Sequence, residues 1–303
     1  MMENFTNLAI NPTKMYGGAN GNKIGIVYKN ETYMLKFPPK AKKNPALNYS
    51  NSCMSEYVAC HIFEALGFET QETVLGLYND KVTVACKDFE VNGFLLKDFA
   101  HLKNTILDSE QNGYGTELTD ILNTIQEQRL LPPDRLKAFF WKMFIGDALL
   151  GNFDRHNGNW GFLVNATTGE AKIAPIFDCG SCLYPQLDDD KMAFVLRSEE
   201  ELTTRIFVFP TSSVQLDNKK INYAQFLMET DNEDCLRALA DLSGKIDMQK
   251  IKAIIEDTPS ITATQKKFFT KIIEVRKELI LDRALAHHRS AAMTSKRGLP
   301  PYQ

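Results

Sequence analysis

The chain has 303 residues, of which 44% are apolar and 24% charged, the balance of an ordinary globular protein with a substantial core. This length indicates two domains or one enzyme with two lobes. The formal net charge of −3 gives no overall basic field, so we expect neither nucleic acid nor a membrane surface as a partner.

The first residues, MMENFTNLAINPTKM, lack the basic region and apolar core of a secretory signal. No apolar run approaches the roughly 18 residues that would span a bilayer. Six cysteines are present, and Cys179 and Cys182 form a Cys-x-x-Cys pair without the two further ligands that a zinc site needs. We therefore expect a soluble, cytoplasmic protein with reduced thiols and no metal at that pair.

Residues 1–90 are predicted to form a small lobe rich in strands. The strands follow from alternating apolar residues between turn signals such as Asn79-Asp80, and the helix follows from an apolar stripe. Ser52 or Ser55 is the expected N-cap of this helix. The predicted elements are strands at 24–28, 32–37, 73–78 and 81–89 and a helix at 54–66.

Residues 91–303 are predicted to form a larger, mostly helical lobe. Pro132-Pro133-Asp134 is a helix start signal with Asp134 as a cap or first-turn acid, and the apolar helix that follows ends at Gly151-Asn152. A hairpin comes next, and helices are predicted at 248–256 and 263–287. The fold class is therefore α+β with two lobes, divided near residues 89–96.

The segment GNFDRHNGNWGFL, residues 151–163, places many polar side chains between an apolar helix and an apolar strand. Asp154 is followed five residues later by Asn159, and Asp178 comes after the hairpin. One carboxylate can orient an attacking hydroxyl, while an amide and a second carboxylate can hold Mg²⁺ on the phosphates of ATP. The Asp-x₄-Asn spacing equals that of the protein-kinase catalytic loop, so we interpret this turn as a catalytic loop.

The N-terminal part supplies the remaining contacts that such a reaction needs. Lys36 stands on a strand after the glycine-rich loop, where it can pair with phosphates, and Glu56 is placed on the next helix to hold that lysine. Each part alone has an ordinary structural explanation, but all occur in the order found in kinases. The loop whose backbone we expect to approach phosphate consists of Gly17, Gly18, Ala19, Asn20 and Gly21.

Two further residues of the polar segment are assigned separately. His156 is either a packed loop histidine or a group that approaches the phosphates, and we assign it to the nucleotide site. Arg155 is expected to brace the loop through an ion pair.

The segments GNFDRHNGNWGFL and IAPIFDCGSCL together resemble the HipA-like serine/threonine kinases of bacteria. The resemblance runs from Tyr16 to the C-terminal helices and implies a two-lobed, protein-kinase-like fold that uses ATP and Mg²⁺. It implies that Asp154 is the catalytic aspartate, that Asn159 and Asp178 are magnesium ligands, and that Lys36 is the phosphate lysine. The acceptor would be a serine or threonine hydroxyl of a protein, the chain itself included.

Toxins of this family carry an extra N-terminal subdomain through which they meet a DNA-binding antitoxin. Here the glycine-rich loop begins already at Gly17, which puts an antitoxin partner in doubt. The resemblance also allows delivery outside the producing cell, by a route other than a classical signal peptide.

Two alternatives remain at this point: a kinase for a lipid or small molecule, and a catalytically inactive nucleotide-binding interaction module. A lipid kinase usually needs a basic or apolar element that faces a membrane, and none stands out. An inactive module has no need of Asp154. The acids at 188–190 and 199–201 are either a solvated surface or a docking rim that favours a basic substrate segment.

Overall fold

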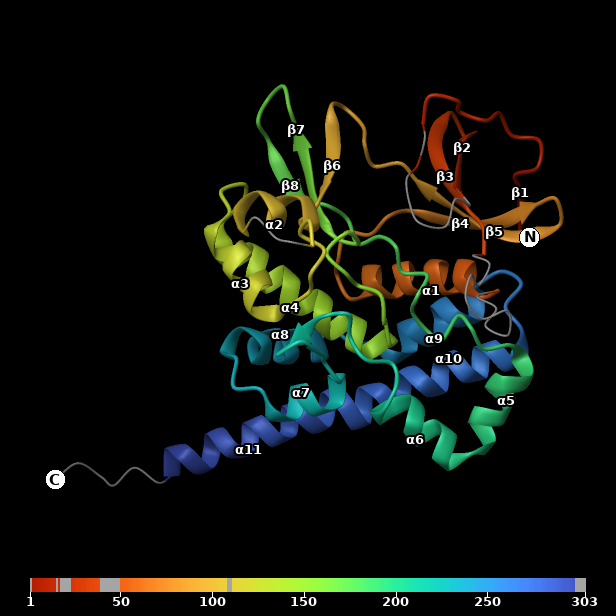
Figure 1. Cartoon of the computed structure of the whole chain (residues 1–303). Coiled ribbons are helices and arrows are strands. Elements are labelled where there is room, and N and C mark those ends of the chain that lie inside the picture. The colour runs from red at the N-terminus through yellow and green to blue at the C-terminus, as the bar shows by residue number, and fades with distance from the viewer. Residues whose placement is uncertain (1, 15, 17–22, 39–49, 108–110, 298–303) are drawn as a thin grey trace.

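The computed structural model describes residues 2–14, 16, 23–38, 50–107 and 111–297. The two larger sheets lie on one side of the molecule and most helices on the other (Figure 1). This arrangement confirms the predicted strand-rich N-terminal part and the larger helical C-terminal part. The division drawn between residues 90 and 91 stays a prediction.

The N-terminal part is built on a five-stranded sheet in the order β1-β4-β5-β3-β2. Two-residue turns join β2 to β3 and β4 to β5, and both residues of each turn have positive φ, as in the tight hairpins that match strand twist. Strand β3 lies between β2 and β5, so Lys36 stands at the end of an inner strand of the sheet. The strands are β1 (Glu3–Asn4), β2 (Lys23–Tyr28), β3 (Glu31–Lys36), β4 (Thr73–Tyr78) and β5 (Lys81–Lys87).

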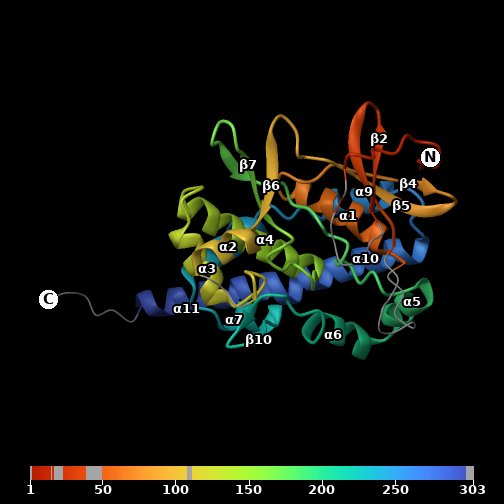
Figure 2. The same cartoon turned by 45° about the horizontal axis from the view of Figure 1, so that its top comes forward.

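A second, three-stranded sheet stands beside the first and consists of β6 (Phe94–Asp98), β7 (Gly161–Asn165) and β8 (Ala171–Ile173) (Figure 2). The predicted hairpin is confirmed as β7 and β8. Strand β6 was not predicted, because the sequence reads as helical after about residue 95. Strand β6 forms by pairing with β7, which lies far away in sequence, and such pairing overrides local preference.

Helix α1 packs between the five-stranded sheet and the helical part, where it contacts β4, β5 and α9. Its N-cap is Asn51, and neither Ser52 nor Ser55 caps it, because Ser55 is buried within the helix body. The predicted helix at 263–287 begins at 263 with a capping box and continues to Arg297 through one π-helical segment, η1. The helices of the N-terminal and central segments are α1 (Ser52–Ala65), α2 (Phe99–Leu107), α3 (Leu118–Glu127), α4 (Pro133–Leu150), α5 (Asp189–Arg197) and α6 (Glu199–Phe207).

The later elements follow a short hairpin formed by β9 and β10. One hydrophobic core joins α1 and strands β4 and β5 to the helices of the C-terminal part. Among the described residues, no helix is long and apolar enough to cross a membrane. The elements are β9 (Gln215–Leu216), β10 (Lys219–Lys220), α7 (Tyr223–Glu229), α8 (Glu233–Ser243), α9 (Met248–Asp257), α10 (Ala263–Arg276), η1 (Lys277–Asp282) and α11 (Arg283–Arg297).

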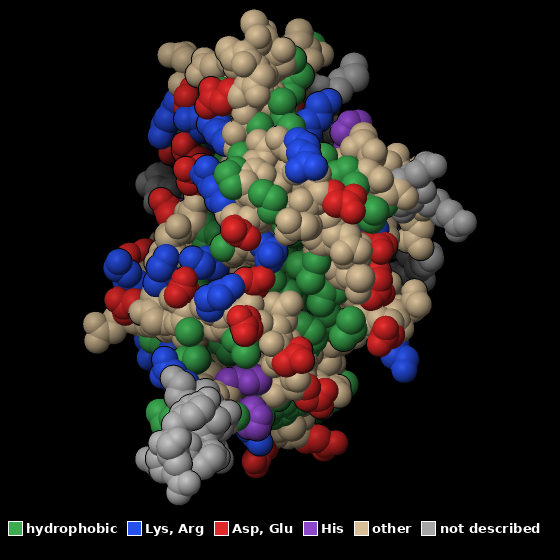
Figure 3. Space-filling model, turned by 90° about the vertical axis from the view of Figure 1, so that its left-hand side faces the viewer, with side chains coloured by type: hydrophobic (Ala, Val, Ile, Leu, Met, Phe, Trp, Pro, Cys, Tyr) green, Lys and Arg blue, Asp and Glu red, His purple; other side chains and the backbone are tan. Residues whose placement is uncertain are grey.

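Basic and acidic side chains are interspersed over much of the face drawn in Figure 3. This distribution agrees with the small net charge of −3. On this face, therefore, no broad patch of one sign suggests an electrostatic partner.

Candidate active site

Helix α4 ends directly before the polar segment that was predicted to be a catalytic loop. Every residue from 143 to 150 is buried, and the helix ends at Gly151, whose φ of 65° is a left-handed conformation that glycine adopts without strain. The chain therefore leaves a fixed helix end and turns at once into the loop.

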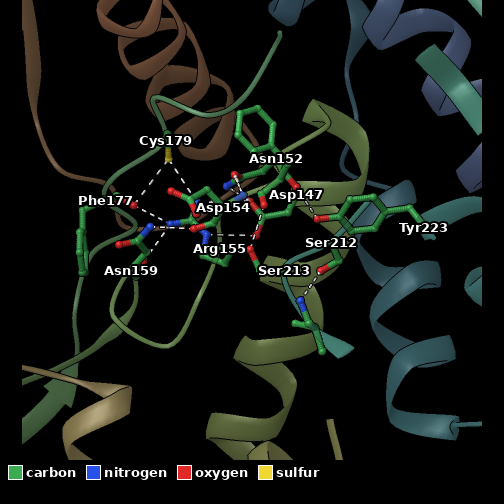
Figure 4. A network of polar contacts seen from close by, with 12 residues as sticks. Asp147, Asn152, Asp154, Arg155, Asn159, Phe177, Cys179, Ser212, Ser213 and Tyr223 are labelled. Atoms are coloured by element: carbon green, nitrogen blue, oxygen red, sulfur yellow. Dashed lines mark hydrogen bonds and ion pairs between the residues drawn. The ribbon is translucent and has the colours of Figure 1, made fainter. Parts of the chain in front are cut away.

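Arg155 lies at the centre of this loop and is buried (Figure 4). Its Nε lies 3.0 Å from Oδ2 of Asp147, which confirms the expected ion pair. Its Nη1 donates to the carbonyl oxygens of Asn159 at 2.9 Å and Phe177 at 2.5 Å. One guanidinium thus joins the end of α4, the loop and the strand segment that leads to Asp178.

The buried side chain of Asn152 links the loop to helix α4. Nothing in the sequence pointed to this residue. Its Nδ2 donates to Oδ1 of Asp147 at 2.8 Å, and its Oδ1 accepts from the backbone N–H of Asp154 at 3.0 Å. Tyr223 donates its hydroxyl to the Asn152 carbonyl at 2.7 Å. A sequence signal for Asp147 does exist, since it is the one charged residue in the apolar run 143–150.

The structure brings Asp154 and Asn159 together, as the Asp-x₄-Asn spacing predicts. Asn159 Nδ2 donates to the backbone carbonyl of Asp154 at 2.7 Å, while the Asp154 carboxylate is exposed. Desolvation by the surrounding loop raises the pKa of Asp154, with a further increase from Asp178, against the opposing charge of Arg155. The Asp154 carboxylate is thus available to a substrate.

His156 contributes to the shape of the loop. Its Nδ1 accepts a hydrogen bond from the backbone N–H of Gly158 at 3.0 Å, and its ring meets the ring of Tyr114 edge to face. This geometry explains a histidine here on structural grounds. Its assignment to the nucleotide site stays a prediction.

Lys36, Glu56 and Asp178 form a second group. Lys36 Nζ lies 3.1 Å from Oε2 of Glu56 and 3.0 Å from Oδ1 of Asp178, so the predicted Lys36–Glu56 ion pair is confirmed. Glu56 Oε1 also accepts from the backbone N–H of Cys179 at 3.0 Å. Glu56 therefore positions both the lysine and the backbone next to Asp178.

The charges of this group depend on one another. Burial would lower the pKa of Lys36, but the carboxylates of Asp178 and Glu56 raise it well above its ordinary value. The Lys36 charge holds the pKa of Asp178 far below its usual value despite burial. Burial raises the pKa of Glu56, and Lys36 opposes that increase.

The predicted glycine-rich loop, residues 17–21, lies outside the described residues. The chain just before it is anchored, because Tyr16 donates its hydroxyl to Oδ2 of Asp88 at 2.9 Å. Lys14 forms ion pairs with Asp88 at 2.6 Å and with Glu90 at 3.0 Å. These contacts have no signal in the sequence, and they tie Lys14 and Tyr16 to the connection between β5 and β6.

The acids considered as a docking rim stand at the N-terminal ends of two helices. Asp188 caps α5 by accepting from the backbone N–H of Lys191, and residues 189 and 190 lie in the first turn. Ser198 caps α6, and residues 199–201 form its first turn. Negative charge is stabilised at helix N-termini, which accounts for these acids locally. Their part in docking stays a prediction.

Comparison with known proteins identifies the family of the chain. The family model for the HipA-like C-terminal domain matches residues 15–263. The serine/threonine-protein kinase CtkA of Helicobacter pylori strain J99 is 51% identical over 291 residues, which are 96% of this chain and 89% of the relative.

Solved structures of related proteins have a similar fold. The crystal structure of the proinflammatory kinase CtkA of Helicobacter pylori superposes with a TM-score of 0.89 at 51% identity, covering 95% of this chain and 98% of that one. HipA from the toxin–antitoxin system of Shewanella oneidensis MR-1, solved with HipB and operator DNA, gives a TM-score of 0.56 at 12% identity, over 91% of this chain and 70% of that one, and shows the fold alone. The chain therefore belongs to the family of the HipA-like C-terminal domain, with a kinase-like fold.

Proposed function

We propose that the chain is a serine/threonine protein kinase that transfers the γ-phosphoryl group of ATP, with Mg²⁺, to a hydroxyl of a protein. The observation that carries this proposal is the junction at Arg155. Its guanidinium binds the backbone of Asn159 on the loop and of Phe177 beside Asp178. The junction ties the Asp154–Asn159 loop to the Lys36–Glu56–Asp178 group.

Lys36 is the residue proposed to contact the phosphates. Its ammonium is charged at any physiological pH, because both neighbouring carboxylates raise its pKa. Glu56 and Asp178 hold it from two sides, which preorganises the charge before the nucleotide binds. A preorganised cation stabilises the charge that develops on the phosphoryl group without further rearrangement.

Asp154 is proposed to orient the acceptor hydroxyl and to receive its proton at the carboxylate. Within the described part of the chain, no hydrogen bond or ion pair occupies this carboxylate, which agrees with that role. Its raised pKa brings it closer to working pH, which makes it a better base than an ordinary aspartate.

The oxygens around Asp178 fit a magnesium ion. Asp178 has one oxygen on Lys36, and Asn159 uses its amide nitrogen for the Asp154 carbonyl, which leaves an oxygen of each without a partner among the described residues. Carboxylate and amide oxygens are ligands that Mg²⁺ accepts, and the bound ion would neutralise charge on the β- and γ-phosphates. Asp178 and Asn159 are thus the residues proposed to hold it.

The rival functions are less well supported. An inactive module would not require the intact Lys36–Glu56 ion pair together with an exposed Asp154. A lipid kinase differs in its acceptor, and an experiment separates the two. The protein is incubated with labelled ATP, Mg²⁺ and either a generic basic protein or lipid vesicles, followed by phosphoamino-acid analysis.

Labelled phosphoserine or phosphothreonine, absent with Asp154→Asn, is the expected result. Label only in lipid, or equal labelling by the variant, would contradict the proposal.

A further inference from the structure

The segment between residues 212 and 223 is fixed directly to the catalytic loop. Ser213 donates its Oγ to the carbonyl of Phe153 at 2.9 Å, next to Asp154, and Tyr223 donates to the carbonyl of Asn152. In Figure 4, Ser213 and Tyr223 lie on one side of the loop, and Phe177 and Cys179 on the other. This segment therefore borders the loop on the side away from the Lys36–Asp178 group.

The hairpin β9–β10 rises from this segment and is braced along its length. Gln215 donates its backbone N–H to the carbonyl of Thr116 at 2.8 Å. At the turn, the Glu117 carboxylate accepts from the backbone N–H groups of Asp217 at 3.0 Å and Asn218 at 3.1 Å. The hairpin is thus a supported element rather than a free loop, and the Glu117 charge is engaged by its turn.

Strand β10 carries two exposed cations, Lys219 and Lys220. Consecutive residues of a strand point to opposite faces, so the two ammonium groups differ in surroundings. Lys220 pairs with Gln215, two residues after the Ser213 that is bonded to the Phe153 carbonyl, whereas Lys219 pairs with Leu216, one position nearer the turn. Lys220 is also among the charges that lower the pKa of the Asp154 carboxylate. Within the described residues, neither ammonium takes part in an ion pair or a hydrogen bond, so neither is explained by the packing of the fold.

We propose that Lys220 determines substrate specificity by binding a carboxylate side chain of the protein substrate, close in sequence to the accepting serine or threonine. This inference rests on the proposed kinase function and adds the charge of the substrate to it. Three observations carry it: the rigid support of the hairpin, the exposed and unpaired ammonium, and the attachment of the hairpin's base to Phe153, the residue before Asp154.

The range of the Lys220 charge limits how far the recognised acid can lie from the acceptor residue in the substrate sequence. Exposed charges act on one another over about one Debye length, ~8 Å at physiological ionic strength. An extended peptide advances about 3.3 Å per residue. A lysine that acts on the acceptor site over this range can reach an acid within about three residues of the acceptor in the substrate. This preference is opposite in sign to the one predicted from the acids at 188–190.

The test compares three peptides that differ only near the acceptor serine, where they carry Asp, Asn or Lys. With wild-type protein, we expect kcat/KM about two- to fivefold higher for the Asp peptide than for the Asn peptide, the size of an exposed ion pair. Lys220→Gln should abolish this ratio, and Lys220→Glu should reverse it in favour of the Lys peptide. Lys219→Glu is the matched control and should keep the wild-type order.

The other possible outcomes contradict the inference in different ways. Transfer to all peptides with no charge preference, or a preference that Lys220→Gln leaves intact, overturns the inference and leaves the kinase function standing. A raised KM for ATP in Lys220→Gln, with the Asp preference unchanged, would show that the lysine contacts the nucleotide instead. No transfer to any peptide overturns the proposed function as well. A melting temperature equal to that of the wild-type protein verifies that the Lys219 and Lys220 variants fold.

Discussion

Lys36 Nζ and Asp178 Oδ1 lie 3.0 Å apart although 142 positions separate them in the sequence. The lysine ends an inner strand of the N-terminal sheet, and the aspartate follows β8 in the other part of the chain. Their contact brings the proposed phosphate lysine next to the proposed metal ligand. Asp178 has a φ of 56°, a strained conformation that persists where surrounding contacts determine it.

Removing the charge of Glu56 should lower the activity of the enzyme. Glu56→Gln keeps an oxygen for the Cys179 N–H but no longer attracts the Lys36 ammonium. Displacement of a positioned group costs up to about 100-fold, so we expect kcat/KM to fall roughly 10- to 100-fold. Glu64→Gln, on an exposed position of the same helix, is the control and should behave as wild type. Equal activity of both variants would refute the positioning role of Glu56.

Magnesium binding can be measured without turnover. A ligand that binds only the folded state raises the melting temperature, so Mg²⁺ should add to the thermal shift produced by ATP. Asp178→Ala and Asn159→Ala should each reduce this added shift, because each removes one of the proposed oxygen ligands. If both variants keep the full magnesium-dependent shift, the ion is bound elsewhere.

Activity should depend on pH through Asp154. The ionised carboxylate is the active form, and its pKa is raised, so kcat/KM should fall on the acid side at a higher pH than an ordinary aspartate would give. Lys220 lowers this pKa, so Lys220→Gln should move the acid limb to still higher pH. Lys219→Gln is the control and should leave the limb in place. A limb identical in all three proteins would mean that another group titrates.

Stability should depend on pH through Asp178. Its pKa is lower in the folded protein than in the unfolded chain, so its contribution is complete above the unfolded value and is lost as pH falls toward the folded one. Asp178→Asn should therefore destabilise the protein at neutral pH, with a smaller difference from wild type in strong acid. Urea unfolding at several pH values measures this, and a constant difference across pH would argue against the ion pair with Lys36.

Arg155 should contribute to stability and activity in separable ways. Arg155→Met leaves the buried Asp147 carboxylate without its partner, which typically costs about 3–5 kcal/mol of unfolding free energy. Adding Asp147→Asn removes that unpaired charge and should restore much of the stability. Activity should stay low in the double variant, because the bonds to Asn159 and Phe177 are still missing. Recovery of full activity would show that Arg155 acts only through stability.

Local features of the fold and the order of the site motifs were predictable from the sequence. Hairpin turns, the start of α4 and its end at Gly151 depend on residues adjacent in the chain, which impose their backbone conformations directly. The Asp-x₄-Asn spacing is also local, since five residues of one loop determine how Asn159 reaches the Asp154 carbonyl.

The remaining features are decided only by tertiary structure. Strand β6 exists because β7 pairs with it, and Arg155 is neutralised because α4 ends with Asp147 beside it. The position of Lys220 beside the catalytic loop depends on Ser213 reaching Phe153 across 60 positions. No local periodicity encodes such contacts, because they arise when segments distant in sequence are buried together and their polar groups must find partners.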